Sequence, residues 1–230
     1  MKTKVLSASL ALLLLFALAM NGYAYQIVGL DNFQKDRIYT TDVFSDNDIS
    51  NWYYPNVVSA YEYRLMDGIG SNLFRPNGNV TIAEAITIAV RINCIYFDGG
   101  LPEFETDVDI VWYDAYVQSA LRRNIIESEY PDYDATATRA QFVEILSRSI
   151  NPLDFEEINW VNDGAIPDMP ADAAYADAVY MLYRAGILIG SDATGRFNPD
   201  STITRAEVAA IITRIVDPDL RKTVELNGNY

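Results

Sequence analysis

The chain contains no histidine and only one cysteine among its 230 residues. Without histidine, neither a Ser-His or Cys-His catalytic pair nor a zinc site with a histidine ligand can form. The single cysteine, Cys94, lies in an apolar stretch with helical spacing, so we expect a buried thiol without a disulfide partner in the chain. No glycine-rich phosphate loop is present. We therefore predict a protein without cofactors that is not an enzyme, and only a carboxylate pair acting on a glycosidic bond stays open.

Aspartate-rich loops raise the question of a calcium site. A loop of the EF-hand type needs oxygen ligands at alternate positions, a central glycine and a glutamate at position twelve. Residues 192–196 place an arginine at the third ligand position, and residues 46–48 lack both the glycine and the final glutamate. We expect no metal site of this type, which leaves weak surface binding of Ca²⁺ open.

Positive charge is scarce, with 17 lysines and arginines against 32 acidic residues and a formal net charge of −15. Such a balance argues against nucleic acid and anionic lipid as partners, because both would be repelled. It suits an extracellular protein.

The N-terminus has the features of an export signal. Lys2 and Lys4 precede an uncharged apolar stretch over residues 10–20, and small residues end at Ala24. The stretch is shorter than the roughly 20 residues that a membrane-spanning helix needs, and no other segment could span a membrane. We predict cleavage after Ala24, a net charge of −17 for the rest because two lysines leave, and no membrane insertion of the mature protein.

A Thr-x-Ala-Glu/Gln motif occurs three times, starting at Thr81, Thr138 and Thr204. Apolar residues follow each threonine at four, seven and eight positions, which is one face of an amphipathic helix. The motif itself is a capping box, in which the threonine accepts from the third helical N–H and the Glu or Gln reaches back. We therefore predict three helices that begin after these threonines. Ten positions after each threonine stand arginines that we expect to be structural: Arg91, Arg148 and Arg214.

A second helix is expected upstream of each capping box. Trp52 and Trp112 open two of these helices, and Ala174 stands at the corresponding position of the third. Connectors with Gly68 and Gly190 then lead through turns to the capping boxes. The unit is helix, loop, helix in about 50 residues, and three such units can share one core.

We predict the following organisation. An export signal covers 1–24, a lead-in 25–42, repeats 43–96, 104–150 and 166–216, a link 151–165, and a polar tail 217–230.

The repeated pattern resembles the S-layer homology domain. The resemblance covers residues 43–216 and rests on Phe-x-Asp at 44–46, Trp-Tyr at 52–53, Gly-x-x-x-Gly at 186–190, Phe-x-Pro at 197–199 and Thr-Arg-Ala-Glu at 204–207. It implies a mainly α-helical, pseudo-threefold, three-pronged bundle of helical hairpins. It also implies secretion to the cell surface and non-covalent binding of an acidic, often pyruvylated, secondary cell-wall polymer in the grooves between prongs.

The family's binding arginine lies in Thr-Arg-Ala-Glu and matches Arg139 and Arg205, whereas the first repeat has Ile82. Each arginine falls in the first turn of a helix, where the helix dipole disfavours a cation by a few tenths of a kcal/mol. A helix N-terminus with a guanidinium is a good carboxylate or phosphate site. The residues alone leave ligand binding and pairing with a nearby acid equally open, and the resemblance favours ligand binding.

The remaining candidates have plainer roles as well. Trp52 and Trp112 can stack on sugar rings, although packing in the core or at a groove edge is favoured. Gly68 and Gly190 are expected where the backbone is left-handed or crowded, and the resemblance adds close approach of a ligand. Asp46 and Asp168 are expected mainly to cap the first helix of their repeats. The complete candidate set for polymer binding is Arg139, Arg205, Gly190, Gly68, Trp52, Trp112, Asp46 and Asp168.

We therefore predict a secreted protein that binds a cell-wall polysaccharide. The alternative is an envelope protein that has lost the polymer site and binds another surface protein. Ile82, Ala174 and the glycines missing at Asn124 and Ser128 favour this alternative. The most complete groove is expected in the third repeat, through Arg205 and Gly190.

Overall fold

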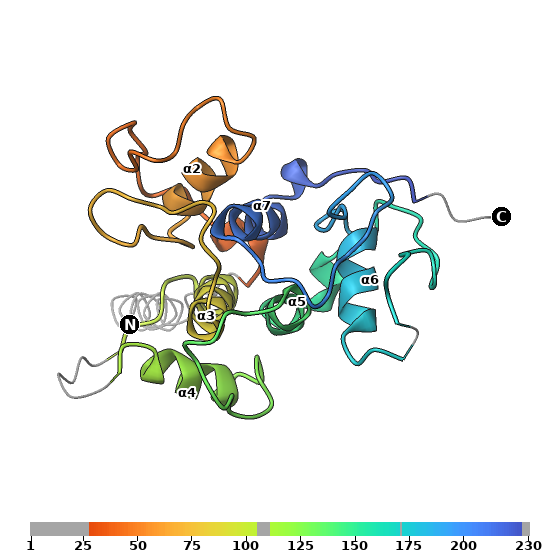
Figure 1. Ribbon diagram of the computed structural model, residues 1–230. Coiled ribbons are helices and arrows are strands. Elements are labelled where there is room, and N and C mark those ends of the chain that lie inside the picture. The colour runs from red at the N-terminus through yellow and green to blue at the C-terminus, as the bar shows by residue number, and fades with distance from the viewer. Residues whose placement is uncertain (1–27, 105–110, 171, 227–230) are drawn as a thin grey trace, which may run out of the picture.

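The computed structural model describes residues 28–104, 111–170 and 172–226 (Figure 1). This part of the chain contains six α-helices in three consecutive pairs, which confirms the mainly α-helical fold. The pairs are α2 (Tyr54–Glu62) with α3 (Ile82–Asp98), α4 (Asp114–Arg122) with α5 (Arg139–Ser147), and α6 (Ala176–Arg184) with α7 (Arg205–Val216); the short 3-10 helices are η1 (Leu30–Asn32), η2 (Pro152–Asp154) and η3 (Pro218–Leu220). The predicted export signal lies outside the described residues, and the predicted repeat boundaries stay a prediction.

The second helix of each pair begins at the predicted capping box. Thr81 Oγ1 accepts a hydrogen bond from the backbone N–H of Glu84 at 3.2 Å, and the Glu84 carboxylate accepts from the Thr81 N–H at 3.0 Å. The same reciprocal bonds form between Thr138 and Gln141 and between Thr204 and Glu207. The capping prediction is confirmed at all three positions.

The segments in front of these helices pair with one another in a closed ring. Antiparallel bridges join Thr81 to Thr136, Thr138 to Thr202, and Thr204 to Asn79. The ring therefore passes from the first pair to the second, from the second to the third, and from the third back to the first. Because it closes after three steps, each part of one pair has a counterpart in the two others.

The first helix of each pair packs against the second helix of a different pair. Helix α4 lies on α3, α6 lies on α5, and α2 lies on α7, while α3 and α5 are neighbours in the centre (Figure 1). The expected hairpins, in which the two helices of one repeat pack together, are therefore not the packing units. The connector, residues 63–81 in the first pair, is long enough to carry the chain from one packing unit to the next.

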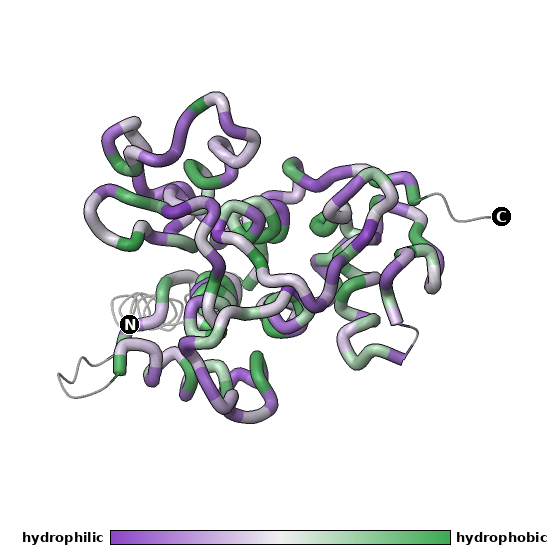
Figure 2. The backbone as a smooth tube through the Cα atoms, viewed as in Figure 1, coloured by the Kyte–Doolittle hydropathy of each residue, from purple (hydrophilic) through white to green (hydrophobic). Residues whose placement is uncertain are grey.

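The shared core is made by the predicted apolar faces. The residues seven positions after the capping threonines are buried, namely Ile88, Ile145 and Ile211. Figure 2 shows hydrophobic residues along the central helices and many hydrophilic ones in the outer loops. Each helix in the described ranges is too short or too polar to cross a lipid bilayer.

Cys94 is expected to react slowly with thiol reagents in the folded protein. It lies in α3 with 2 % of its surface exposed, and burial raises its pKa to about 11. Because the thiolate is the reactive form, we expect native protein at pH 8 to react at least about a hundredfold more slowly than protein unfolded in guanidinium. The absorbance change with a disulfide reagent measures both rates, and similar rates would contradict the burial of this side chain.

Candidate ligand-binding grooves

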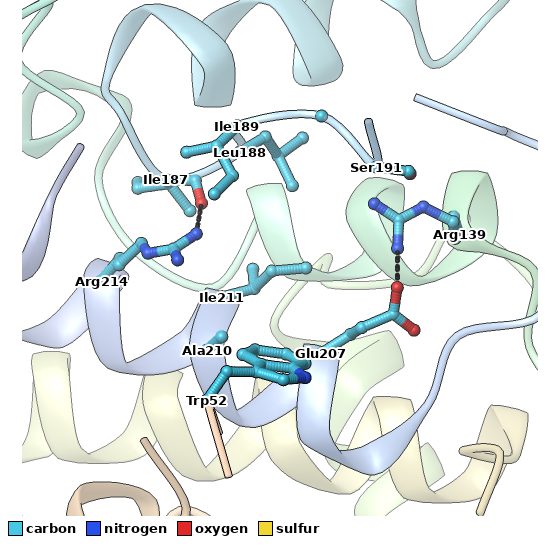
Figure 3. A pocket seen from close by; sticks show the side chains of 11 residues that line it. Trp52, Arg139, Ile187, Leu188, Ile189, Ser191, Glu207, Ala210, Ile211 and Arg214 are labelled. Atoms are coloured by element: carbon cyan, nitrogen blue, oxygen red, sulfur yellow. Dashed lines mark hydrogen bonds and ion pairs between the residues drawn. The ribbon is translucent and has the colours of Figure 1, made fainter. Parts of the chain in front are cut away.

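Two grooves between the helical pairs are built from equivalent residues. The first, here the Trp52 groove, has a volume of about 230 Å³ (Figure 3) and is lined by Trp52, Arg139, residues 187–191, Glu207, Ala210, Ile211 and Arg214. The second, here the Trp112 groove, has a volume of about 210 Å³ and is lined by Trp112, Arg205, residues 65–69, Glu84, Thr87, Ile88 and Arg91. Each therefore presents a tryptophan, two arginines, a glutamate and a glycine-containing loop.

Each groove draws its residues from all three helical pairs. In the Trp52 groove, the tryptophan precedes α2, Arg139 begins α5, and the loop 187–191 leads to α7. The expectation that Arg205 and Gly190 share one groove is wrong, because Gly190 lines the Trp52 groove and Arg205 lines the other. The closed ring is the reason, since it places the start of each second helix beside the connector of the next pair.

The third equivalent position, around α5, lacks these features. Its pocket is lined by residues 125–130, Glu144, Ile145 and Arg148, and Ala174 lies in an adjoining pocket that shares Glu144 and Arg148. Ala174 replaces the tryptophan, Ser128 replaces the glycine, and Ile82 replaces the arginine of the capping motif. The three departures thus fall at one position in the ring, and the two other grooves keep a complete set.

Arg139 is a buried link between the second and third pairs. Its Nε donates to the carbonyl of Phe197 at 2.7 Å, and Nη1 bonds the Glu207 carboxylate at 2.9 Å. Its guanidinium also lies over the Phe197 ring, 5.6 Å from the centroid. The pairing with an acid that the sequence left open is therefore present.

Arg205 makes the corresponding link between the third and first pairs. Its Nε donates to Phe74 O at 2.7 Å, and Nη1 bonds the Glu84 carboxylate at 2.9 Å. Its Nη2 makes a further bond, to the carbonyl of Asp67 at 2.6 Å. Both arginines are only 6 % exposed, so each contributes to the structure as well as lining a groove.

The helix N-termini do not contribute free N–H groups to these grooves. At α5, the N–H of Arg139 donates to Ser201 O at 2.9 Å and that of Ala140 to Pro199 O at 3.1 Å. The next N–H, of Gln141, is taken by Thr138 Oγ1. Helices α3 and α7 are satisfied in the same way. The backbone N–H groups that were expected to help bind an anion are therefore not available, because the neighbouring connector and the capping threonine already accept from them.

Trp52 and Trp112 lie at the groove edges and not in the core. Their exposed fractions are 62 % and 58 %, and each ring lies edge-on to the tyrosine that follows it, with ring centroids 5.5 and 5.4 Å apart. Of the two alternatives left open by the sequence, core packing or a groove edge, the structure shows the groove edge. An exposed indole face beside a polar wall can stack on an apolar face of a sugar ring.

The backbone is left-handed at Gly190 and crowded at Gly68, as predicted from the sequence. Gly190 has φ of 82°, and a Cβ atom there would lie 2.6 Å from the Cα of Gly195. At Gly68 a Cβ atom would lie 2.6 Å from Cε1 of Phe44 and 2.8 Å from the carbonyl oxygen of Leu73. A side chain at either position would displace the loop that lines the groove.

Asp46 and Asp168 hold the connectors and do not cap helices. The Asp168 carboxylate accepts from the N–H groups of Phe197 at 2.8 Å and Asn198 at 2.7 Å, and Asp46 holds Phe74 and Arg75 in the same way. The expected caps are wrong, because α2 and α6 begin after tyrosines without a side-chain cap. Asp168 thereby fixes Phe197, whose carbonyl accepts from Arg139.

Replacing Asp168 with alanine is expected to destabilise the protein by about 1–3 kcal/mol, because two backbone donors lose their acceptor. The urea midpoint should fall, and Asp200→Ala, at an exposed aspartate of the same connector, should leave it unchanged. Equal midpoints for the two variants would show that the carboxylate does not hold the loop.

Arg91 and Arg214 line the grooves, which their positions in the sequence did not predict. Both were expected to be structural from their position in the helices, yet they line the Trp112 and Trp52 grooves respectively. Their common spacing of ten residues from a capping threonine was the available signal. Spacing alone did not show that the apolar loop of the same pair would fold beside them.

Comparison with known families identifies two of the three pairs. A family model of the S-layer homology domain matches residues 44–86 and 165–209, which contain α2 and α6, the connectors and the first turn of α3 and of α7. These two segments are S-layer homology domains. The second pair lies between the two matched S-layer homology segments and shares their ring geometry.

Several larger proteins are similar to this S-layer homology chain. A surface-layer 125 kDa protein of Lysinibacillus sphaericus is 28 % identical over 119 residues, covering 48 % of this chain and 10 % of that protein. An endoglucanase of Bacillus sp. strain KSM-635 is 23 % identical over 220 residues, covering 94 % and 23 %. An amylopullulanase of Thermoanaerobacterium thermosulfurigenes is 25 % identical over 182 residues, covering 76 % and 9 %. The chain spans less than a quarter of each relative.

Proposed function

We propose that this protein attaches non-covalently to the bacterial cell surface by binding a wall polysaccharide in the Trp52 and Trp112 grooves. The S-layer homology match and the surface-layer relative support attachment to the cell surface in general. The observation that supports a polysaccharide ligand is an exposed indole face opposite an arginine-bearing wall, repeated in two equivalent grooves. Sugar rings combine an apolar face with polar rims, and such a groove matches both.

The ligand we propose is an acidic secondary wall polymer. Each groove wall carries two arginines, and guanidinium groups bind carboxylate and phosphate through paired donors. The net charge of −15 opposes an acidic polymer at long range, so the attraction must arise within the grooves. We expect binding to depend only modestly on salt, and a steep loss with added salt would argue against groove binding.

We propose binding without catalysis, although two relatives are named as glycoside hydrolases. Those proteins are much longer than this chain, which spans 23 % and 9 % of them. Hydrolysis of a glycosidic bond usually needs one protonated and one ionised carboxyl group beside the bond. The groove glutamates Glu84 and Glu207 are instead held by the arginines and by capping N–H groups.

A second candidate function is docking of another surface protein. The observation that favours it is the position around α5, where the tryptophan, the glycine and the capping arginine are all replaced. A protein partner at this position would not need the features of a sugar groove.

Co-sedimentation with cell walls tests the proposal. The protein without its predicted export signal is mixed with sacculi of Lysinibacillus sphaericus, the source of the surface-layer relative, before and after removal of the secondary polymer. We expect the protein to pellet with untreated walls only. Equal pelleting with stripped walls would assign the ligand to another wall component, and protein that stays in the supernatant throughout would favour a protein partner.

A further inference from the structure

The two grooves differ in how the arginine near the loop is neutralised. In the Trp112 groove, Arg91 Nη1 bonds the Asp67 carboxylate at 2.8 Å, and Arg37, outside the groove lining, binds the same carboxylate at 2.6 Å. The residue equivalent to Asp67 in the Trp52 groove is Ile189. Arg214 Nη1 there donates to the carbonyl of Ile187 at 3.0 Å, and none of the ion pairs among the described residues involves Arg214.

The environments of these two arginines act on their pKa values in opposite directions. Burial lowers the pKa of Arg214, and no nearby charge offsets that effect. Burial acts on Arg91 in the same sense, but the Asp67 carboxylate and the Tyr116 hydroxyl outweigh it and the pKa of Arg91 is raised. Arg214 is therefore a partly buried cation whose lost hydration is not replaced by an anion, a situation that an acidic ligand would relieve.

The arginines from the capping motif differ as well. Arg205 uses all three guanidinium nitrogens, because Nη2 reaches the carbonyl of Asp67. Arg139 uses Nε and Nη1, and its Nη2 has no hydrogen-bond partner among the described residues. In Figure 3 this second terminal nitrogen points away from Glu207 toward the middle of the groove. The two N–H groups on Nη2 of Arg139 are thus available to a ligand in the Trp52 groove, whereas Nη2 of Arg205 in the Trp112 groove already bonds a carbonyl.

We propose that the Trp52 groove alone accepts the acidic group of the polymer, with Arg139 and Arg214 as its cationic contacts, and that the Trp112 groove takes an uncharged sugar. This inference rests on the proposed function. Two arginines and one carboxylate line the Trp52 groove, against two arginines and two carboxylates in the Trp112 groove. Asymmetric charge in otherwise equivalent grooves would orient an alternating acidic and neutral polymer.

The arrangement in Figure 3 suits a carboxylate on a sugar ring. Arg139 and Arg214 lie on opposite sides of the groove, Ile211 lies between them, and Trp52 forms the wall facing the loop 187–191. A ring stacked on Trp52 can direct an acidic substituent to either guanidinium. Apolar neighbours such as Ile189 and Ile211 make the surroundings less polar than water, and this strengthens a charge-assisted hydrogen bond.

The test uses two monosaccharides that differ in one acidic group. N-Acetylmuramic acid carries a lactyl carboxylate that N-acetylglucosamine lacks. The indole N–H signals of the three tryptophans report separately in NMR spectra once each is assigned with a Trp→Phe variant. We expect N-acetylmuramic acid to shift the Trp52 signal more strongly and at lower concentration than N-acetylglucosamine, and to leave Trp112 without this preference.

Two variants test the role of Arg214. Arg214→Gln removes the charge, and Ile189→Asp supplies the carboxylate that Asp67 supplies in the other groove while leaving the hydrogen bond from Arg214 to the Ile187 carbonyl in place. Each should weaken binding of N-acetylmuramic acid at Trp52 by about tenfold or more, the loss of one charge-assisted contact. Arg122→Gln, at an exposed arginine outside the lining of both grooves, is the control and should leave this binding unchanged. Because Ile189 is partly exposed, the second variant keeps the test valid if Arg214→Gln fails to fold.

The inference is overturned if the Trp52 and Trp112 signals prefer N-acetylmuramic acid over N-acetylglucosamine equally, or if the Trp52 signal shows no such preference. It is also overturned if Ile189→Asp binds N-acetylmuramic acid as tightly as the wild type does. Wall co-sedimentation separates this failure from failure of the proposed function. Wild-type protein that pellets with untreated walls but shows no carboxylate preference at Trp52 would leave wall binding intact and remove only the charge assignment. Protein that does not pellet would remove the proposed function itself.

Discussion

Arg139→Ala is expected to lower the free energy of unfolding by about 3–5 kcal/mol, the range for breaking a buried ion pair from one side. The side chain is 7 % exposed, and its loss leaves Glu207 and the carbonyl of Phe197 without their partner. The Phe197 ring also loses the guanidinium above it. Since these contacts join the second and third pairs, the whole ring should weaken and the domain should unfold at a lower temperature.

Thermal and urea unfolding followed by circular dichroism measure this effect. The control is Arg196→Ala, which removes an exposed arginine of the neighbouring connector and should change stability by less than about 0.5 kcal/mol. Arg205→Ala should resemble Arg139→Ala, because its Nη1 bonds Glu84 in the equivalent way. If Arg139→Ala unfolds like the wild type, the ion pair between Arg139 and Glu207 does not hold the second and third helical pairs together. A loss of wall binding in these variants is therefore not by itself evidence of a ligand contact.

Trp52→Ala is expected to weaken wall binding by about thirtyfold or more while leaving the unfolding midpoint unchanged. A tryptophan that is a hot spot for binding commonly contributes 2 kcal/mol or more, which corresponds to this factor. The ring is 62 % exposed and contacts Tyr53 only edge-on, so its removal opens no cavity in the core. Binding and stability should therefore separate at Trp52, in contrast to Arg139.

Depletion isotherms with purified walls measure the affinity of each tryptophan variant. Trp160→Ala is the matched control, since this side chain is 85 % exposed and lies outside both grooves. Trp112→Ala should cause a smaller loss if the Trp52 groove holds the acidic group, and the double variant should bind least. Equal affinities of Trp52→Ala and Trp160→Ala would show that the polymer does not stack on the groove tryptophans.

Stability and binding are coupled in this protein by the way the ring closes. Glu207 both completes the cap of α7 and neutralises Arg139, and Asp168 fixes the connector whose carbonyl accepts from the same arginine. Substitutions at these positions change the groove through the fold. Positions such as Trp52 and Ile189 lie on the groove surface outside this network, and they are therefore the better probes of the ligand.

The sequence by itself determined the second helix of each pair, its start and its apolar face. A capping box such as Thr204 with Glu207 and a stripe such as Val208, Ile211 and Ile212 involve residues a few positions apart, so local geometry decides them. The need for glycine at 190 was visible for the same reason, because a turn is also local.

Only the tertiary structure decided which residues meet in a groove. Arg205 and Phe74 are 131 positions apart, and their contact exists because the third connector pairs back with the first. The same closure filled the helix N-termini and gathered the departures at Ile82, Ser128 and Ala174 at one position. The paired Arg91 and the carboxylate-free Arg214 have the same place in the repeat pattern. Their difference depends on a neighbouring loop residue, Asp67 or Ile189, that only the folded connector brings beside them.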